Sequence, residues 1–167
     1  MTDATDPTDG DQTVSLFVIL PARIDLEQAR VAFAEMAWLG RPVEPPPAEG
    51  WRRVATDLEL AVRDGSGPAV RKAALLDVGP GRSVGEQLLI PIAWRSATFT
   101  PLFPVFAGHL EIDRTGLTLI GDYAPPFGAL GLLIDRSLLQ FVARRTGQAF
   151  LARVAAMTGR LGDDHRV

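Results

Sequence analysis

The chain contains 167 residues, carries a formal net charge of -3 and has a pI near 5.4. A chain of this length is expected to form one domain and to bury about 70% of the surface that its unfolded form exposes. Nucleic-acid binding depends on clustered cations, and the slightly acidic charge balance of this chain gives no sign of them. No nucleic acid is therefore expected as a partner. Cysteine is absent, which excludes disulfides and thiolate metal sites and is compatible with a reducing cytoplasm.

Polar segments are predicted at both ends of the chain. Residues 1–12 contain four aspartates and are predicted to form a disordered acidic lead. They lack the basic start and apolar centre of a signal peptide, so a cytoplasmic location is expected. Residues 159–167 form a polar tail, which leaves residues 13–158 as the folded domain. The longest helical apolar run, Phe127 to Ile134, has eight residues, far fewer than the roughly 20 that cross a bilayer.

The first third of the chain predicts a strand followed by a helix. Asp25 is a suitable N-cap, Gln28 follows at the spacing of a capping box, and Gly40 marks the end of a helix of about fourteen residues. The proline run in residues 41–50 cannot continue this helix and predicts an extended polyproline segment. Before the helix, residues 14–20 are rich in β-formers and predict a strand. The residues expected on one face of this strand are Val14, Leu16, Val18 and Leu20.

From Trp51 onward the hydrophobic period changes to two, which predicts a meander of antiparallel strands. Residues 79–85 are expected to form a turn within it. Pro91 requires a sheet edge or a bulge, because proline cannot donate a hydrogen bond to a neighbouring strand. The expected strands of the meander cover residues 51–63, 70–78, 86–98, 105–113 and 117–123. With the first strand, the sequence therefore predicts about six strands.

A long helix is predicted from Pro126 to about Met157, with a length of roughly 45 Å. Its apolar residues occupy two neighbouring faces, while Arg144, Arg145 and Arg153 lie on the remainder. One face contains Phe127, Leu130, Ile134, Leu138, Phe141, Ala149 and Ala152, and the other contains Leu132, Leu139, Ala143, Phe150, Val154 and Met157. A helix that is apolar over so wide an arc needs a concave partner. The predicted fold is therefore α+β, a curved antiparallel sheet wrapped around this helix, with one short helix after the first strand.

Two segments have the residue types of a catalytic or metal site. Gly81 to Gly85 matches the G-x-S-x-G nucleophile elbow, but an elbow needs a helix after the serine. The following residues have the period of a strand, so a surface hairpin turn is the better interpretation. His109, Glu111 and Asp113 line one side of a strand at a spacing that could chelate a metal, yet this side is expected to face water. Neither a metal nor a cofactor is predicted.

The residues expected to face inward between sheet and helix would either fill the core or line a pocket. Ligand pockets are mostly apolar with a few convergent polar groups, and Ser96, Tyr123 and Arg145 are the polar candidates. For any single one of these side chains, ordinary core packing is the stronger interpretation. The full set of candidate ligand-binding residues is Trp94, Ser96, Phe106, Leu110, Leu119, Tyr123, Ile134, Leu138 and Phe141.

The run PIAWRSATFTPLFPVFAGHLEIDRTGLTLIGDYAPPFGALGLLIDRSLLQFVARRTGQAFLARV contains a tryptophan-bearing strand, the hairpin motif L-T-L-x-G-x-Y, a double proline and the long helix, in that order. In this order of elements the chain, over residues 13–158, resembles the START-like helix-grip (SRPBCC) superfamily, and within it the bacterial polyketide cyclase/dehydrase-like proteins. The resemblance implies a deep hydrophobic cavity between sheet and helix, which would bind a lipid, a sterol, a polyketide or a similar apolar molecule. It implies no catalytic residues, since the superfamily has no invariant catalytic motif.

Three functions are compatible with these features. The first is noncatalytic binding of a hydrophobic small molecule. The second is a cyclase, aromatase or dehydratase acting on a polyketide-like substrate, in which Tyr123 and Arg145 would polarise a carbonyl and Ser96 would help to orient it. The third is an interaction module with a filled cavity, in which residues 128–134 and 100–104 would form an apolar patch for a partner or for peripheral contact with a membrane.

Overall fold

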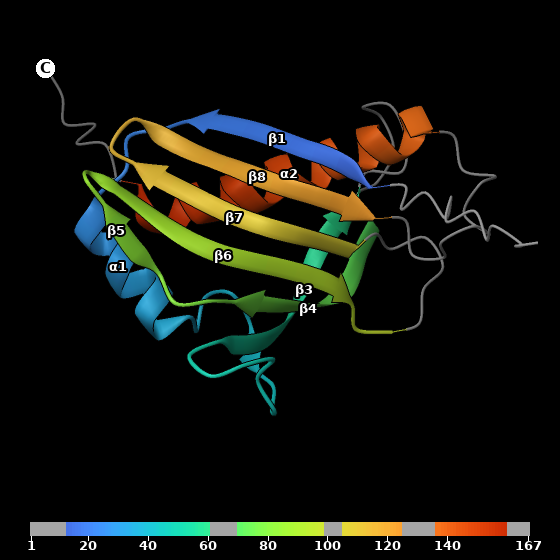
Figure 1. Ribbon diagram of the computed structural model, residues 1–167, viewed down its shortest axis with the longest axis horizontal. Coiled ribbons are helices and arrows are strands. Elements are labelled where there is room, and N and C mark those ends of the chain that lie inside the picture. The colour runs from blue at the N-terminus through green and yellow to red at the C-terminus, as the bar shows by residue number, and fades with distance from the viewer. Residues whose placement is uncertain (1–12, 61–69, 99–104, 125–135, 160–167) are drawn as a thin grey trace, which may run out of the picture.

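The computed structural model describes residues 13–60, 70–98, 105–124 and 136–159 (Figure 1). They form an α+β structure with one eight-stranded sheet and two helices, α1 and α2. No described helix is both long and apolar enough to cross a membrane. In chain order the elements are β1 (Val14–Pro21), α1 (Leu26–Glu35), β2 (Arg41–Pro42), β3 (Arg52–Leu60), β4 (Val70–Val78), β5 (Arg82–Val84), β6 (Gln87–Ser96), β7 (Val105–Asp113), β8 (Gly116–Ala124) and α2 (Arg136–Thr158).

The strands follow one another in the order β1-β8-β7-β6-β4-β3-β2, and β5 pairs with β6 beside this path. Every pairing is antiparallel, as the meander predicted. The first strand, β1, forms one edge of the sheet and pairs with the last strand, β8, with Val14 opposite Tyr123 and Pro21 opposite Gly116. In Figure 1, β1, β8, β7 and β6 run side by side, and α2 lies behind them. The apolar residues of the strands alternate as expected, so the inner face of the sheet forms the core with α2.

The expected number of six strands is wrong, because two short strands lie in segments that were predicted to be irregular. Arg41 and Pro42 pair with Ala55 and Val54, inside the proline run. Residues 82–84 pair with residues 87–89, and Gly85 has a positive φ of 58° in the turn between them. Both strands are too short to show a hydrophobic period in the sequence. Their pairing is imposed by the longer neighbouring strand, so the sequence could not predict them. The second one confirms that G-x-S-x-G is a hairpin turn and not a nucleophile elbow.

Helix α1 is shorter than predicted, and its N-terminal end is hydrogen-bonded to the C-terminal end of α2. The Asp25 carboxylate caps α1 by accepting hydrogen bonds from the N–H groups of Glu27 and Gln28 at 3.0 and 3.2 Å. Met36 ends the helix in the left-handed conformation with a φ of 56°, four residues before Gly40. The Gln28 side chain does not complete a capping box but donates to the Met157 carbonyl at 2.9 Å. The Asp25 N–H donates to the Thr158 carbonyl at 3.0 Å.

Among the described residues of the long helix, the second predicted apolar face is more deeply buried than the first, on which Phe141 and Ala149 are half-buried, although Met157 at the end of the second face is exposed. Ala143, Phe150 and Val154 are each at most 2% exposed, whereas Ala152, on the other face, is exposed. Gly147 lets α2 approach β1 and β8 closely, since a Cβ there would lie 3.1 Å from Val18 Cγ2. The first ten residues of the predicted helix, 126–135, lie outside the described part of the chain.

Pro91 lies in β6 at the point where the pairing changes from β4 to β5. Val78 of β4 is paired with Ile92, and Leu89 is paired with Arg82 of β5. The Gly79 N–H donates to the Pro91 carbonyl at 2.8 Å. The missing N–H of Pro91 therefore falls at a local break in the sheet, which has the same physical effect as the expected edge or bulge.

The turn between β7 and β8 is the one that the sequence D-R-T-G predicts. One carboxylate oxygen of Asp113 accepts hydrogen bonds from the Thr115 hydroxyl at 2.6 Å and from the N–H groups of Thr115 and Gly116 at 2.7 and 3.0 Å. These bonds, above all the Thr115 hydroxyl, lower the pKa of Asp113. Their contribution to stability is therefore present above the ordinary carboxyl pKa and is lost as the pH falls through the lowered value.

A pair of glycines on neighbouring strands lets the aromatic ring of Phe106 lie directly on the sheet. Gly108 of β7 is opposite Gly121 of β8. A Cβ at Gly121 would lie 2.3 Å from the Ala107 carbonyl oxygen and 2.8 Å from a ring carbon of Phe106. Covering backbone glycines with an aromatic ring compensates for the missing side chains and accommodates curvature in a sheet.

Replacing Gly121 with alanine should therefore lower the free energy of unfolding by about 1–3 kcal/mol, because the added methyl group forces Phe106 and the adjacent backbone apart. Denaturant unfolding measures the change. Gly81→Ala is the matched control, since its Cβ would meet no atom closer than 3.4 Å. Equal stability of the two variants would contradict the close packing of Phe106 on the glycine pair.

Candidate functional site

Five of the predicted ligand-binding residues lie in the centre of the core. Trp94, Phe106 and Tyr123 occupy neighbouring positions across β6, β7 and β8. The Trp94 and Phe106 rings are stacked, with centroids 4.2 Å apart, and Phe150 of α2 packs on Trp94 at 5.6 Å. Leu110 and Leu119 belong to the same inner face, and none of the five is more than 1% exposed. In this packing they support the helix and offer no open surface.

The remaining predicted residues do not join this cluster. Ser96 is half-buried at the end of β6, where its hydroxyl donates to the Thr98 carbonyl and accepts from the Thr98 N–H. The guanidinium of Arg145 lies 5.5 Å above the Phe141 ring and is exposed, whereas Tyr123 is buried. Ile134 lies outside the described residues. Leu138 belongs to α2, but its side chain is not among those described.

Three polar atoms in the core have no hydrogen-bond partner among the described residues. They are Trp94 Nε1, Tyr123 Oη and Thr146 Oγ1. A buried polar group without a partner costs about 1–3 kcal/mol. Burial raises the pKa of Tyr123 well above its ordinary value, and the nearby Thr146 hydroxyl opposes this only in part. Tyr123 is therefore a neutral phenol over the whole physiological range.

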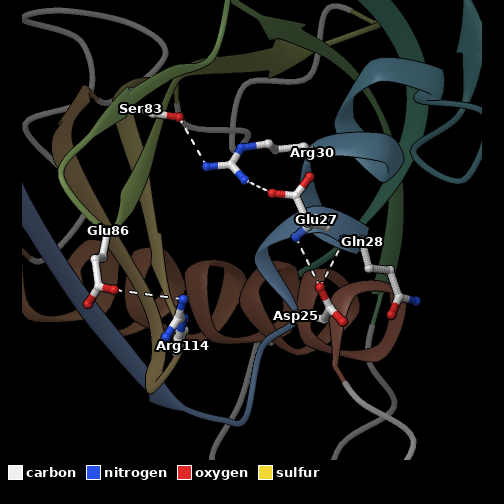
Figure 2. Close-up of polar contacts among 7 residues, drawn as sticks. All are labelled: Asp25, Glu27, Gln28, Arg30, Ser83, Glu86 and Arg114. Atoms are coloured by element: carbon white, nitrogen blue, oxygen red, sulfur yellow. Dashed lines mark hydrogen bonds and ion pairs between the residues drawn. The ribbon is translucent and has the colours of Figure 1, made fainter.

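The largest hollow, of about 1210 Å³, lies beside the N-terminus of α1 and is lined also by the turns that follow β5 and β7. Figure 2 shows its polar contacts. The Arg30 guanidinium forms an ion pair with Glu27 and donates to Ser83 Oγ at 3.2 Å. Arg114 lies 3.7 Å from Glu86. Asp25 is occupied as the N-cap of α1. The charges that these residues bring to the hollow are thus paired with one another.

A second hollow, of about 290 Å³, lies where α1 faces β4 and β6. It is lined by two arginines, Arg30, whose contacts are described above, and Arg52, which donates to the carbonyls of Phe33 and Ala34. These carbonyls belong to the C-terminal end of α1, where the helix dipole favours a positive charge. Arg52 therefore serves as a cap for α1, and its role is structural.

A third hollow, of about 480 Å³, opens between β3 and α2, and we refer to it as the α2 cleft. Phe150 is one of its lining residues, and the Phe150 ring packs on Trp94, so Phe150 separates the cleft from the other rings of the core. It has both apolar and charged walls. The lining residues are Leu39, Gly40, Ala55, Thr56, Asp57, Leu58, Arg71, Ala149, Phe150 and Arg153.

Arg153 is a charged residue of the α2 cleft that is held by three hydrogen bonds. It is half-buried, and its guanidinium donates to Thr56 Oγ1 at 2.9 Å and to the carbonyls of Trp38 and Leu39 at 2.6 and 3.0 Å. All three acceptors are neutral, and no described carboxylate forms an ion pair with Arg153. These bonds fix the orientation of the guanidinium, because each comes from a separate main-chain or side-chain group.

Sequence reasoning placed Arg153 on the polar remainder of the long helix and missed Thr56. A signal for Arg153 was present, since it follows Phe150 by three residues and so lies on nearly the same side of a helix. The polar residue Thr56 also stands on the apolar face of its strand and is only 7% exposed. A buried polar residue on an apolar face indicates a partner, and here that partner is Arg153.

No metal centre is found among the described residues, where no three histidine, aspartate or glutamate side chains are grouped. His109 and Glu111 are half-exposed, with Nε2 and Oε1 3.1 Å apart. The comparisons identify no relative of the chain: no family model, curated protein or solved structure matches it. The geometry of the α2 cleft is therefore the basis for a functional proposal.

Tyr123 is the sole tyrosine of the chain, so tyrosinate absorbance reports on it alone. Because burial raises its pKa, the folded state favours the protonated phenol. Its contribution to stability is fully present below the ordinary tyrosine pKa of about 10 and falls by about 1.4 kcal/mol per pH unit above it. We expect no tyrosinate signal until the protein unfolds in alkali.

The matched variant is Tyr123→Phe, which removes both the ionisable group and the unpaired hydroxyl. Its stability at neutral pH should equal or exceed that of the parent chain, and its alkaline unfolding should shift to higher pH. Ionisation of Tyr123 near its ordinary pKa in a chain that circular dichroism shows to be folded would contradict its burial.

Proposed function

We propose that this protein is a noncatalytic helix-grip protein that binds a small, mainly apolar molecule between its sheet and its C-terminal helix, in the α2 cleft. The observation that carries the proposal is the position of the cleft, which lies between β3 and α2 and ends on Phe150. Its volume of about 480 Å³ falls in the range of about 300–1,000 Å³ that is usual for small-molecule sites.

Contacts along α2 support a sheet that curves around the helix. Gly147 faces β1 and β8, Phe150 packs on Trp94 of β6, and Arg153 reaches Thr56 of β3. Residues three apart on a helix point in directions that differ by about 60°, so these three contacts span about 120° of the helix circumference within less than two turns. Strands β1 and β3, which lie on opposite sides of β6 in the sheet, thus contact the same short part of α2.

The proposed site differs from the residue set expected from the sequence. Trp94, Phe106 and Tyr123 lie behind Phe150 and support the inner wall, while Leu39 and Leu58 supply apolar surface at the cleft itself. A bound molecule would reach the aromatic cluster only through a movement of Phe150.

The positions of Tyr123 and Arg145, the two groups that the cyclase alternative requires, favour binding without catalysis. Tyr123 is a poor general acid in this fold, because its pKa is raised by burial and its hydroxyl is shielded from solvent. Arg145 lies on the exposed side of α2. General acid–base catalysis needs a group within hydrogen-bond reach of the substrate and with a pKa near the working pH.

A large side chain placed in the α2 cleft should weaken the binding of an apolar ligand. Ala149 lines the cleft and is half-buried, whereas Ala152 on the same helix is exposed and lies outside the cleft lining. With methyl octanoate as the probe, amide shifts in a nuclear magnetic resonance titration give the dissociation constant. We expect Ala149→Trp to weaken binding about tenfold or more, which corresponds to a loss of about 1.4 kcal/mol.

Ala152→Trp is the matched control and should bind the probe as the parent chain does. Thermal unfolding of both variants verifies that the fold is intact. The proposal fails if the parent chain does not bind methyl octanoate, or if the shifted amides lie away from β3 and α2.

A further inference from the structure

We propose that the α2 cleft selects ligands that bear a carboxylate, and that Arg153 binds this group. The inference rests on the proposed function and adds the chemical class of the ligand. It follows from the hydrogen bonds of Arg153, from the charges along the cleft and from the contrast with the other arginines of the structure.

The guanidinium of Arg153 has donors to spare. An arginine side chain carries five N–H groups, and three of them are used for Thr56, Trp38 and Leu39. The Nε–H and one Nη1–H therefore remain without a protein acceptor among the described residues. These two donors lie on different edges of the guanidinium and point in different directions, so a carboxylate oxygen can accept a charge-assisted hydrogen bond from either of them, but the carboxylate cannot accept from both as a fork.

Three other arginines that line hollows in the described structure have an anionic or dipolar partner. Arg30 is paired with Glu27 and Arg114 with Glu86, while Arg52 meets the C-terminal carbonyls of α1. Away from the hollows, Arg53 holds Asp77 through two bonds of 2.6 and 3.0 Å. Arg153 differs from all four, because its acceptors are neutral and its charge is uncompensated.

The rest of the cleft favours an anion with an aliphatic body. Its described lining contains two guanidinium groups, Arg71 and Arg153, and one carboxylate, Asp57. Arg71 is paired in the sheet register with Glu59 of β3, so Arg153 is the cation that an anion in the cleft would meet. The apolar lining residues Leu39, Leu58 and Phe150 lie beneath this cation and are each at most 4% exposed. A half-buried cation held in place by neutral groups gains most from an anion that arrives already partly desolvated on an apolar ligand.

The test compares octanoate with its methyl ester, which share the aliphatic body and differ in charge. Dissociation constants come from amide shifts at neutral pH. The parent chain should bind octanoate about ten- to a hundredfold more tightly than the ester, as expected for charge-assisted hydrogen bonds. Arg153→Gln should reduce the preference for octanoate over the ester to about twofold or less, because the charge that distinguishes the two compounds is lost.

Arg144→Gln is the matched control, because Arg144 lies on the exposed side of the same helix and should retain the preference. If Arg153→Gln does not fold, Arg153→Lys is used, which keeps the charge but loses the planar guanidinium and should lower the preference several-fold. Equal binding of acid and ester by the parent chain overturns the carboxylate site and leaves the proposed function intact. Absence of binding by both compounds overturns the proposed function as well.

Discussion

The packing of Phe150 on Trp94 holds α2 against the centre of the sheet, and the other features of the inner face depend on it. Trp94 is stacked in turn on Phe106, and Phe106 covers the glycine pair of β7 and β8. Aromatic pairs of this kind stabilise a core by about 0.5–1.5 kcal/mol beyond the area that they bury. The series runs from the helix to the backbone of the sheet without a gap, so the position of α2 is defined by contact at each step.

The same anchor determines where polar groups of α2 are placed. Thr146 precedes Phe150 by one turn and is buried with an unpaired hydroxyl, next to Tyr123. Arg153 follows Phe150 by nearly one turn and emerges in the cleft beside β3. The unpaired hydroxyl of Thr146 therefore lowers stability, while Arg153, about two turns later on the same helix, places a cation with a fixed orientation at the α2 cleft. Unsatisfied or uncompensated polar groups concentrate where a protein has a function besides folding.

Two neighbouring parts of the C-terminal half of α2 differ in the same respect. At its C-terminal end, Gln28 and the Asp25 N–H satisfy the carbonyls of Met157 and Thr158, and the charges of the adjacent hollow are paired (Figure 2). That end is a structural junction. In the α2 cleft, the neutral acceptors of Arg153 orient the side chain but leave its charge uncompensated. This contrast, rather than the size of the hollows, distinguishes the α2 cleft as the candidate site.

The sequence alone determined the α+β class, the antiparallel meander, the N-cap of α1, the D-R-T-G turn and the buried face of β6, because each depends on local chemistry or on a period of two. It could not determine β2 and β5, whose pairing is imposed by longer neighbouring strands. It also did not decide between the two apolar faces of α2, and it did not show that the candidate residues Trp94, Phe106 and Tyr123 are closed into the core and do not line the α2 cleft. Only the tertiary structure decided these points, since the burial of a helical face and the surroundings of Arg153 depend on which distant segments, Trp38–Leu39 and Thr56, are brought beside it.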